Sequence, residues 1–230
     1  MSTTEIEPYR LSRRGFLNAA ALGAASIAVS ACTTVARRPV EPPPANFEPP
    51  LMDYATMYGP VSDNGFELPG IPYEKIDEQF LRQIVPDPTG QRPGTIVVDT
   101  QNKFLYYVMG GGEAMRYGIG VGREGFEWRG TARIAAKREW PTWTPPSAMI
   151  KRQPELAKFA GGMDPGLTNP LGARALYLFN KGGDSGYRLH GSPEWNSIGK
   201  AMSSGCIRLM NQDIIDLYDR TSVGAKVIVL

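Results

Sequence analysis

A series of short segments rich in β-branched and aromatic residues begins at Thr95 and continues to the end of the chain. The first two, 95–99 and 104–109, are separated by a polar turn, and Gly110-Gly111-Gly112 then leads into a third at 114–121. Such residues favour strands, and polar or glycine-rich breaks favour the turns between them. We therefore expect a three-strand meander, followed by further strands at 131–137, 175–179, 187–190 and 226–230.

Two segments show helical periodicity. Between Tyr73 and Val85 the apolar residues recur at intervals of three and four and are closed by Pro86, which predicts one amphipathic helix. A second helix is predicted over 212–220, with Asn211 as its N-cap. The fold class predicted from these patterns is mostly β: one sandwich or barrel with one or two short helices.

The first 31 residues have the features of an export signal and are set apart from the fold. Arg13-Arg14 within Ser12–Leu17 resembles a twin-arginine signal, and the apolar run 19–31 is too short to span a bilayer. The run ends in Val29-Ser30-Ala31-Cys32, which resembles a lipobox, so Cys32 is predicted to carry a lipid. The alternative is a conventional signal peptide cut nearby, with Cys32 as a bystander. Either interpretation predicts an exported, periplasmic protein, and Thr33 after a lipidated Cys32 favours the outer membrane.

The region after Cys32 is expected to be a tether followed by an extension. Residues 32–50 are rich in proline, a composition that stays extended and does not pack. Residues 51–92 form an N-terminal extension that includes the short predicted helix. Another segment, 139–170, is predicted to be a long loop rich in aromatic residues and proline. Loops of this length in a compact domain are usually functional.

Composition excludes two function classes. Lys and Arg number 25 against 23 Asp and Glu, a formal charge of +2 that is too balanced for binding nucleic acid through many phosphates. The two cysteines and one histidine are too few for a structural zinc site, which takes four such ligands. We therefore expect no nucleic-acid partner and no metal.

The only histidine, His190, precedes the sequence Ser203-Ser204-Gly205-Cys206-Ile207-Arg208. A cysteine nucleophile needs an adjacent base and a backbone that can direct N–H groups at a developing oxyanion. The small residues before Cys206 permit such a turn. The alternative is that Cys206, the one thiol left if Cys32 is lipidated, is a small buried apolar residue.

His-Gly at 190–191, a spacer and then Ser-x-Gly-Cys-Ile-Arg resemble the active-site signature of the L,D-transpeptidase (YkuD-type) catalytic domain. Further segments resemble that family in the same order, so the resemblance covers 93–230 and predicts a catalytic domain there; they are 93–99, 117–122, 140–146, 169–178 and 227–230. The chain departs from the family at Ser204, where many members carry a second histidine. This leaves the nucleophile and the base in place.

The resemblance implies a bacterial enzyme that acts on peptidoglycan stem peptides. By matching positions, Cys206 is the nucleophile, His190 the base and the Gly191 carbonyl the group that orients the imidazole. The N–H groups of Gly205 and Cys206 form much of the oxyanion hole. The resulting thioester is resolved by an amine of a neighbouring stem, by an amine of a wall-anchored protein or by water. The resemblance also implies that no organic cofactor is needed and that carbapenems acylate the enzyme.

Other residues near the motif have two interpretations each. Arg208 either binds a substrate carboxylate or forms a structural ion pair. Ser203 and Ser204 either donate hydrogen bonds to the donor stem or only form the turn. Trp143 is assigned to a substrate groove, whereas Trp140 and Tyr117 are either groove or core residues.

Three functions from different classes remain open at this point. The first is a transpeptidase, and the second is an L,D-carboxypeptidase or other hydrolase with the same nucleophile. The third is a non-catalytic wall-binding lipoprotein, which has no need to retain both His190 and Cys206. Because acceptor choice depends on groove shape and water exclusion, the first two are not separated by the nucleophile.

Overall fold

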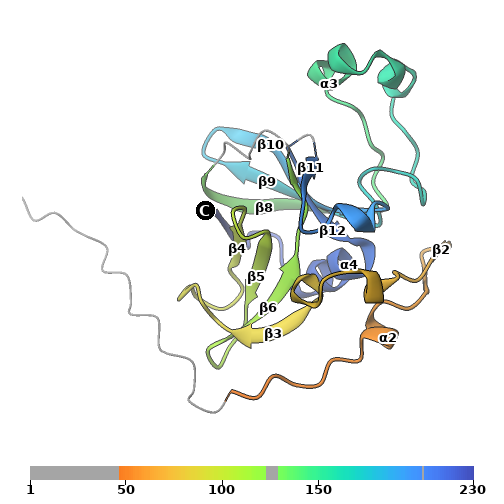
Figure 1. Ribbon diagram of the computed structural model, residues 1–230. Coiled ribbons are helices and arrows are strands. Elements are labelled where there is room, and N and C mark those ends of the chain that lie inside the picture. The colour runs from red at the N-terminus through yellow and green to blue at the C-terminus, as the bar shows by residue number, and fades with distance from the viewer. Residues whose placement is uncertain (1–46, 123–128, 204) are drawn as a thin grey trace, which may run out of the picture. The chain divides into compact units, whose positions relative to one another are not determined.

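The computed structural model describes residues 47–122, 129–203 and 205–230 (Figure 1). Its main feature is a nine-stranded sheet in the order β12-β10-β9-β8-β13-β4-β5-β6-β3. The pairs β10–β12 and β13–β4 are parallel, and the other neighbours are antiparallel. The strands are β3 (Gln83–Pro86), β4 (Ile96–Asp99), β5 (Phe104–Val108), β6 (Glu113–Gly118), β8 (Gly130–Glu139), β9 (Arg174–Asn180), β10 (Gly183–Ser192), β12 (Ile207–Met210) and β13 (Lys226–Val229).

The predicted meander is present as β4, β5 and β6, and each later predicted strand is also found. The mostly-β fold class is therefore confirmed. The C-terminal strand β13 is central because it inserts between β4 and β8, with Val227 opposite Ile96 and Ala132. Val227 and Val229 are buried on one face, and Ile228 on the other is half-buried, which agrees with the unbroken apolar sequence of this central strand.

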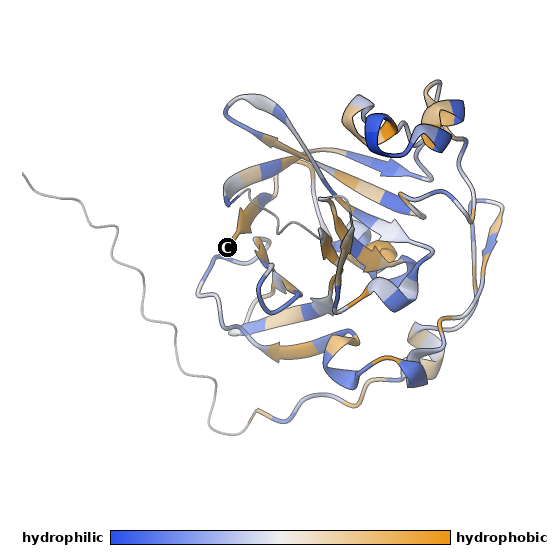
Figure 2. Ribbon diagram, turned by 45° about the horizontal axis from the view of Figure 1, so that its top comes forward, coloured by the Kyte–Doolittle hydropathy of each residue, from blue (hydrophilic) through white to orange (hydrophobic). Residues whose placement is uncertain are grey.

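The core lies between the two halves of the bent sheet, which pack in a sandwich-like arrangement. Figure 2 shows apolar positions gathered on the central strands. One cluster joins fully buried residues from both halves, among them Ile96, Leu105, Ile134, Leu178 and Leu189. Burial of this surface is the main stabilising contribution to the fold.

The C-terminal helix α4 (Asn211–Arg220) follows β12 directly and packs on β9, β10 and β12. Its apolar residues Ile214 and Leu217 are fully buried in the main core. Side chains from other strands bind its polar groups: Tyr117 of β6 donates to Asp216 at 2.5 Å, and Lys137 of β8 donates to the Tyr218 carbonyl at 2.6 Å. The helix predicted at 212–220 is therefore confirmed.

The helix predicted over 73–85 is wrong. The segment contains two short 3-10 turns, η1 (Tyr73–Lys75) and η2 (Glu78–Phe80), and then strand β3. Leu81 and Arg82 are successive buried residues with different surroundings: Leu81 lies in an apolar cluster that Phe80 also contacts, and Arg82 forms an ion pair with Asp213. The backbone at Leu81 is extended, which directs successive side chains to opposite sides. Pairing of β3 with β6 instead satisfies the backbone at the edge of the sheet.

The extension also contains helix α2 (Tyr54–Met57) and the hairpin β1 (Val61–Asp63) and β2 (Phe66–Leu68). The hairpin turns through Asn64 and Gly65, with φ of 50° and 83°, the left-handed pair that a two-residue turn requires. Hydrogen bonds and ion pairs from Tyr58, Asp63 and Arg82 connect the extension to the domain. Residues 47–51 are irregular and half-buried or exposed.

The long segment between β8 and β9 forms helix α3 (Ser147–Arg152) and the 3-10 helix η3 (Pro154–Phe159), which the sequence did not predict. These two elements pack on each other, and Figure 1 shows them projecting beyond the sheet. A second short sheet pairs β7 (Val121–Gly122) with β11 (Ala201–Ser203), and η4 (Trp195–Ser197) lies between β10 and β11. In the part of the chain that the structure describes, no helix has the length and apolar character needed to span a membrane.

Candidate active site

The parallel pair β10–β12 brings the two motif segments together. Its register places His190 opposite Arg208 and Leu189 opposite Ile207, so Cys206 lies at the end of β12 beside Arg188. Alternate residues of a strand share a face, which puts His190 and Arg208 on one side of the sheet. This register places the predicted base and the predicted nucleophile on neighbouring strand segments, although sixteen positions separate them in the sequence.

His190 is buried, with 4% of its surface exposed, and its Nδ1 lies 2.6 Å from the Gly191 carbonyl oxygen. Because a carbonyl can only accept, this contact requires a proton on Nδ1. Burial lowers the pKa of His190 to about 4, although the carbonyls of Gly191 and Pro170 favour the protonated ring. The imidazole is therefore neutral near pH 7, with its proton on Nδ1 and a lone pair on Nε2.

Cys206 is partly buried, and burial raises the pKa of its thiol. The backbone of Arg188 and the charges of Arg188 and Arg208 act in the opposite direction. The preceding residue, Gly205, has φ of 125°, a conformation that residues with a side chain rarely adopt. A neutral thiol and a neutral imidazole on neighbouring strands are suited to proton transfer during attack rather than to a preformed ion pair.

Asn211 does not cap helix α4. Met210 is the N-cap, and the Asn211 side chain is turned away from the helix so that its Oδ1 accepts the N–H of Ala173 at 3.0 Å. Asn169, which is fully buried, acts similarly: its side-chain nitrogen donates to the carbonyls of Pro141 and Asp164, each at 3.0 Å. Sequence reasoning missed both roles, and the only available signal was Asn169-Pro170, a common turn dipeptide.

Arg208 forms an ion pair with Glu194, with Nη1 and Oε2 separated by 2.6 Å. The arginine side chain is 17% exposed and the glutamate 60%. The backbone of Arg208 also exchanges two hydrogen bonds of 2.9 Å with Gly120, which joins β12 to the end of β6. The ion pair agrees with the structural interpretation of Arg208, although the exposed position of Glu194 makes it a weak structural contact.

The aromatic residues fall into two groups. Tyr117 is fully buried in the core, and Trp140, 6% exposed, stacks on Phe66 and donates its indole N–H to Asp63 at 2.7 Å. Trp143 is half-buried; its backbone pairs with Met163 across the long segment, and its ring lies 6.1 Å from that of Phe159. Tyr117 and Trp140 are therefore core residues, whereas Trp143 stays a groove prediction.

The remaining predicted residues are described only in part. Ser203 is the last residue of β11, where its backbone pairs with Gly122. Ser204 and Cys32 lie outside the described residues, as do the twin-arginine segment and most of the tether.

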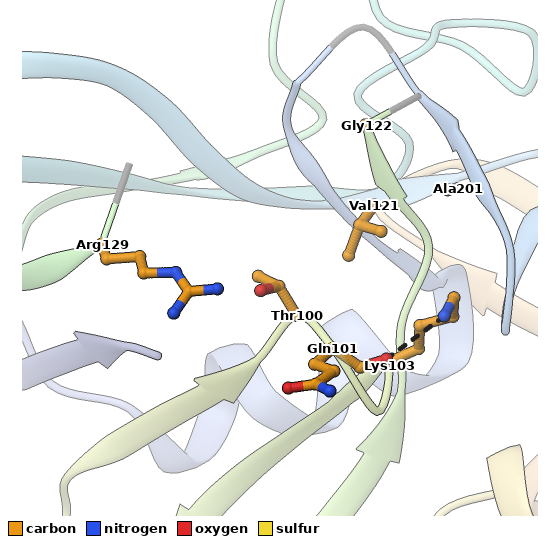
Figure 3. Close-up of a pocket in the computed structure, with 7 residues that line it drawn as sticks. All are labelled: Thr100, Gln101, Lys103, Val121, Gly122, Arg129 and Ala201. Atoms are coloured by element: carbon orange, nitrogen blue, oxygen red, sulfur yellow. Dashed lines mark hydrogen bonds between the residues drawn. The ribbon is translucent and has the colours of Figure 1, made fainter. Parts of the chain in front are cut away.

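A cavity of about 320 Å³ lies beside β11, between the β4–β5 turn and β7. Figure 3 shows the Arg129 guanidinium directed toward Thr100 across this cavity. Ala201 of β11 also lines it, five positions before Cys206. His190 and Cys206 are not among its lining residues, so this cavity is distinct from the thiol and imidazole.

Comparison with known proteins gives the family. The L,D-transpeptidase catalytic domain (YkuD) matches residues 93–229. A probable L,D-transpeptidase ErfK/SrfK of Salmonella typhimurium is 31% identical over 199 residues, which cover 80% of this chain and 60% of that protein. A putative L,D-transpeptidase of Fuscovulum blasticum is 33% identical over 137 residues, 59% of this chain and 68% of that protein.

Among solved structures, a Brucella melitensis protein described as a probable carnitine operon oxidoreductase is 48% identical. The match covers 69% of this chain and all but 1% of that one, with a TM-score of 0.47. The chain thus spans about 60% of the length of its Salmonella relative. The family match extends over more than half of the chain and includes both His190 and Cys206. This chain therefore belongs to the YkuD family of L,D-transpeptidase catalytic domains.

Proposed function

We propose that this protein is a peptidoglycan L,D-transpeptidase that uses Cys206 as its nucleophile and His190 as its base. The observation that carries the proposal is the β10–β12 register, which joins a buried, neutral imidazole to the strand that follows the thiol. The Nδ1 proton of His190 is engaged by Gly191, so Nε2 is the nitrogen able to accept the thiol proton. The family match supports the same assignment.

In the first step the thiol proton passes to His190 while sulfur attacks the carbonyl before the terminal D-Ala of a tetrapeptide stem. A C–S bond forms and the carbonyl oxygen becomes an oxyanion, which the N–H groups of Gly205 and Cys206 are proposed to stabilise. Collapse of this intermediate breaks the C–N bond. His190 returns the proton to the departing amine, so D-Ala leaves and a thioester remains.

In the second step the amine of an acceptor attacks the thioester. His190 takes a proton from this amine, a C–N bond forms and the C–S bond breaks, and His190 passes the proton to the departing sulfur, which restores the thiol. An amine of a neighbouring stem gives a cross-link, an amine of a wall-anchored protein gives protein attachment, and water gives a tripeptide. The proton that the thiol loses to D-Ala in the first step is replaced by the acceptor's proton in the second, so the cycle closes without a cofactor.

The nucleophile is tested by intact mass. The mature protein is incubated with a carbapenem, and a gain of one inhibitor mass is expected on wild type and no gain on Cys206→Ala. The alanine variant is also expected to lose turnover while keeping a melting temperature close to wild type. Turnover retained by the variant would remove Cys206 from the mechanism.

Acceptor choice is tested with a purified disaccharide-tetrapeptide as the only substrate. Transfer yields dimers together with free D-Ala, whereas hydrolysis yields tripeptide monomers and D-Ala. Accumulation of tripeptide alone would favour the carboxypeptidase over the transpeptidase. Absence of both products and of an adduct, on folded protein, would favour a wall-binding module.

We also propose that the protein is exported to the periplasm and anchored to the outer membrane by a lipid on Cys32, with residues 32–50 as the tether. The lipobox-like Val29-Ser30-Ala31-Cys32 is the observation behind this. Fractionation of cells is expected to recover the wild-type chain with membranes and Cys32→Ser in the soluble periplasmic fraction. Membrane recovery of the serine variant would contradict the anchor.

A further inference from the structure

Asn211 lies where three elements meet behind His190. It is the first residue of α4, follows the last residue of β12, and is 5% exposed. Its Oδ1 accepts the N–H of Ala173, whose carbonyl in turn accepts from the N–H of Trp140 at 2.8 Å. One side chain thus fixes the start of β9 against the start of the helix.

The same oxygen fits between two glycines. A Cβ added to Gly172 would lie 2.2 Å from Asn211 Oδ1, and one added to Gly191 would lie 2.3 Å from it. Neither distance is possible for real atoms, so both positions require glycine while Asn211 keeps this orientation. The Cβ added to Gly172 would also lie 2.6 Å from the carbonyl carbon of Gly191, so the two backbones are in close contact.

Gly191 supplies the carbonyl that holds Nδ1 of His190. Because Gly172, Ala173 and Asn211 pack directly behind Gly191, they fix the direction of this carbonyl. We propose that Asn211 is a positioning residue for His190: its amide oxygen holds the Gly191 peptide so that the imidazole stays in the Nδ1–H tautomer and presents Nε2 to the thiol. The effect of Asn211 on catalysis rests on the proposed function, whereas its effect on the His190 tautomer does not.

The tautomer matters because only one nitrogen of a neutral imidazole can accept a proton. With the proton on Nε2, the ring has no lone pair for the thiol, and Nδ1 faces a carbonyl that cannot donate. Because burial lowers the pKa of His190, the ring does not bind a second proton near pH 7, and only one ring nitrogen carries a proton. Loss of the Gly191 position is therefore expected to slow Cys206 chemistry without removing either reacting group.

The experiment uses the single histidine of the chain as a spectroscopic probe. The protein is prepared without a histidine tag, with ¹⁵N-histidine, and the two ring nitrogens are observed at pH 7.5. Wild type is expected to show one tautomer with the proton on Nδ1. Asn211→Ala is expected to show a mixture of tautomers, together with alkylation of Cys206 by iodoacetamide that is slower by about 10-fold or more.

The matched control is Gln212→Ala. Gln212 is the next residue of the helix, is equally buried, and donates to the carbonyls of Gly59 and Pro69 in the N-terminal extension rather than toward His190. It is expected to lower the melting temperature to a similar extent and to leave the tautomer and the alkylation rate as in wild type. Loss of the tautomer in both variants would indicate general loosening and overturn the proposal.

A second variant keeps the test informative if Asn211→Ala does not fold. Asn211→Asp retains the size of the side chain and its acceptor oxygen, so it is expected to retain the Nδ1–H tautomer. Loss of that tautomer in a folded aspartate variant, or its retention in the alanine variant, would contradict the assigned role. The nitrogen spectrum is independent of turnover, so a protein that fails as a transpeptidase still gives an answer on Asn211.

Discussion

Asp63 and Arg174 are 111 positions apart in the sequence and are joined by two parallel hydrogen bonds of 2.7 and 2.8 Å. Asp63 belongs to hairpin strand β1, and Arg174 begins β9, next to Ala173 and the Asn211 contact. The guanidinium holds the pKa of Asp63 below its usual value, although burial opposes this and the Trp140 indole assists it. The N-terminal extension is therefore attached at the base of the candidate site.

The first prediction concerns this pair. Asp63→Ala leaves the largely buried Arg174 without its bidentate partner, and is expected to lower the free energy of unfolding by about 3 kcal/mol. Glu139→Ala is the control, because that carboxylate lies 4.0 Å from the same guanidinium and is half exposed; it is expected to cost under about 1 kcal/mol. Urea unfolding of both variants measures the difference, and equal effects would contradict the prediction.

The second prediction concerns Gly191. Gly191→Ala places a Cβ 2.3 Å from Asn211 Oδ1 and 2.9 Å from Ile214 Cγ2, which the packed interior cannot accommodate. We expect a loss of about 1–3 kcal/mol in stability and a larger loss in Cys206 acylation, because the His190 partner moves. Gly110→Ala is the control, since a Cβ there meets nothing within 4 Å. Acylation of the Gly191 variant at the wild-type rate would contradict the assignment of its carbonyl.

The third prediction separates the two interpretations of Arg208. Its ion pair with Glu194 is exposed on the glutamate side, and such pairs contribute about 0–1 kcal/mol. Glu194→Gln is therefore expected to change the melting temperature little. Arg208→Gln is expected to raise KM for a donor stem with a free carboxylate more than it lowers kcat. A matched drop in melting temperature and kcat for both variants would instead assign Arg208 a structural role.

The fourth prediction uses Asp213, which is fully buried on α4. Burial raises the pKa of Asp213 to about 7, although Arg82 and Tyr58 favour its charged form, and Asp216 adds to the rise. The native state thus binds this proton more tightly than the unfolded chain does. Its contribution to stability is present at low pH and is lost as pH rises toward 7.

Asp213→Asn removes this titration and leaves His190 unchanged. His190 acts with the opposite sign, because its lowered native pKa makes stability rise with pH between about 4 and 6.5. The free energy of unfolding of the variant minus that of wild type is therefore expected to increase from pH 4 to pH 7 and then to level off. Denaturant titrations at four pH values measure this difference, and a constant value would contradict it.

The sequence by itself determined those elements whose stability is local or whose pattern is one-sided. The meander β4–β6, the strands β9 and β10 and the helix α4 each carry a period that fits one conformation only. The roles of His190 and Cys206 were also predicted from the sequence, because the small residues before the cysteine permit a turn and the whole motif resembles a family signature.

Tertiary structure decided the rest. The segment 73–85 has helical spacing, but a short amphipathic helix is marginal alone, and pairing of β3 with β6 together with the burial of Phe80 and Leu81 outweighs it. Asn211 is of a residue type that often caps helices. Its side-chain oxygen instead accepts a hydrogen bond from the N–H of Ala173, which lies 38 positions earlier. Both outcomes depend on residues that are distant in the sequence and that only folding brings into contact. A local sequence pattern cannot predict such contacts.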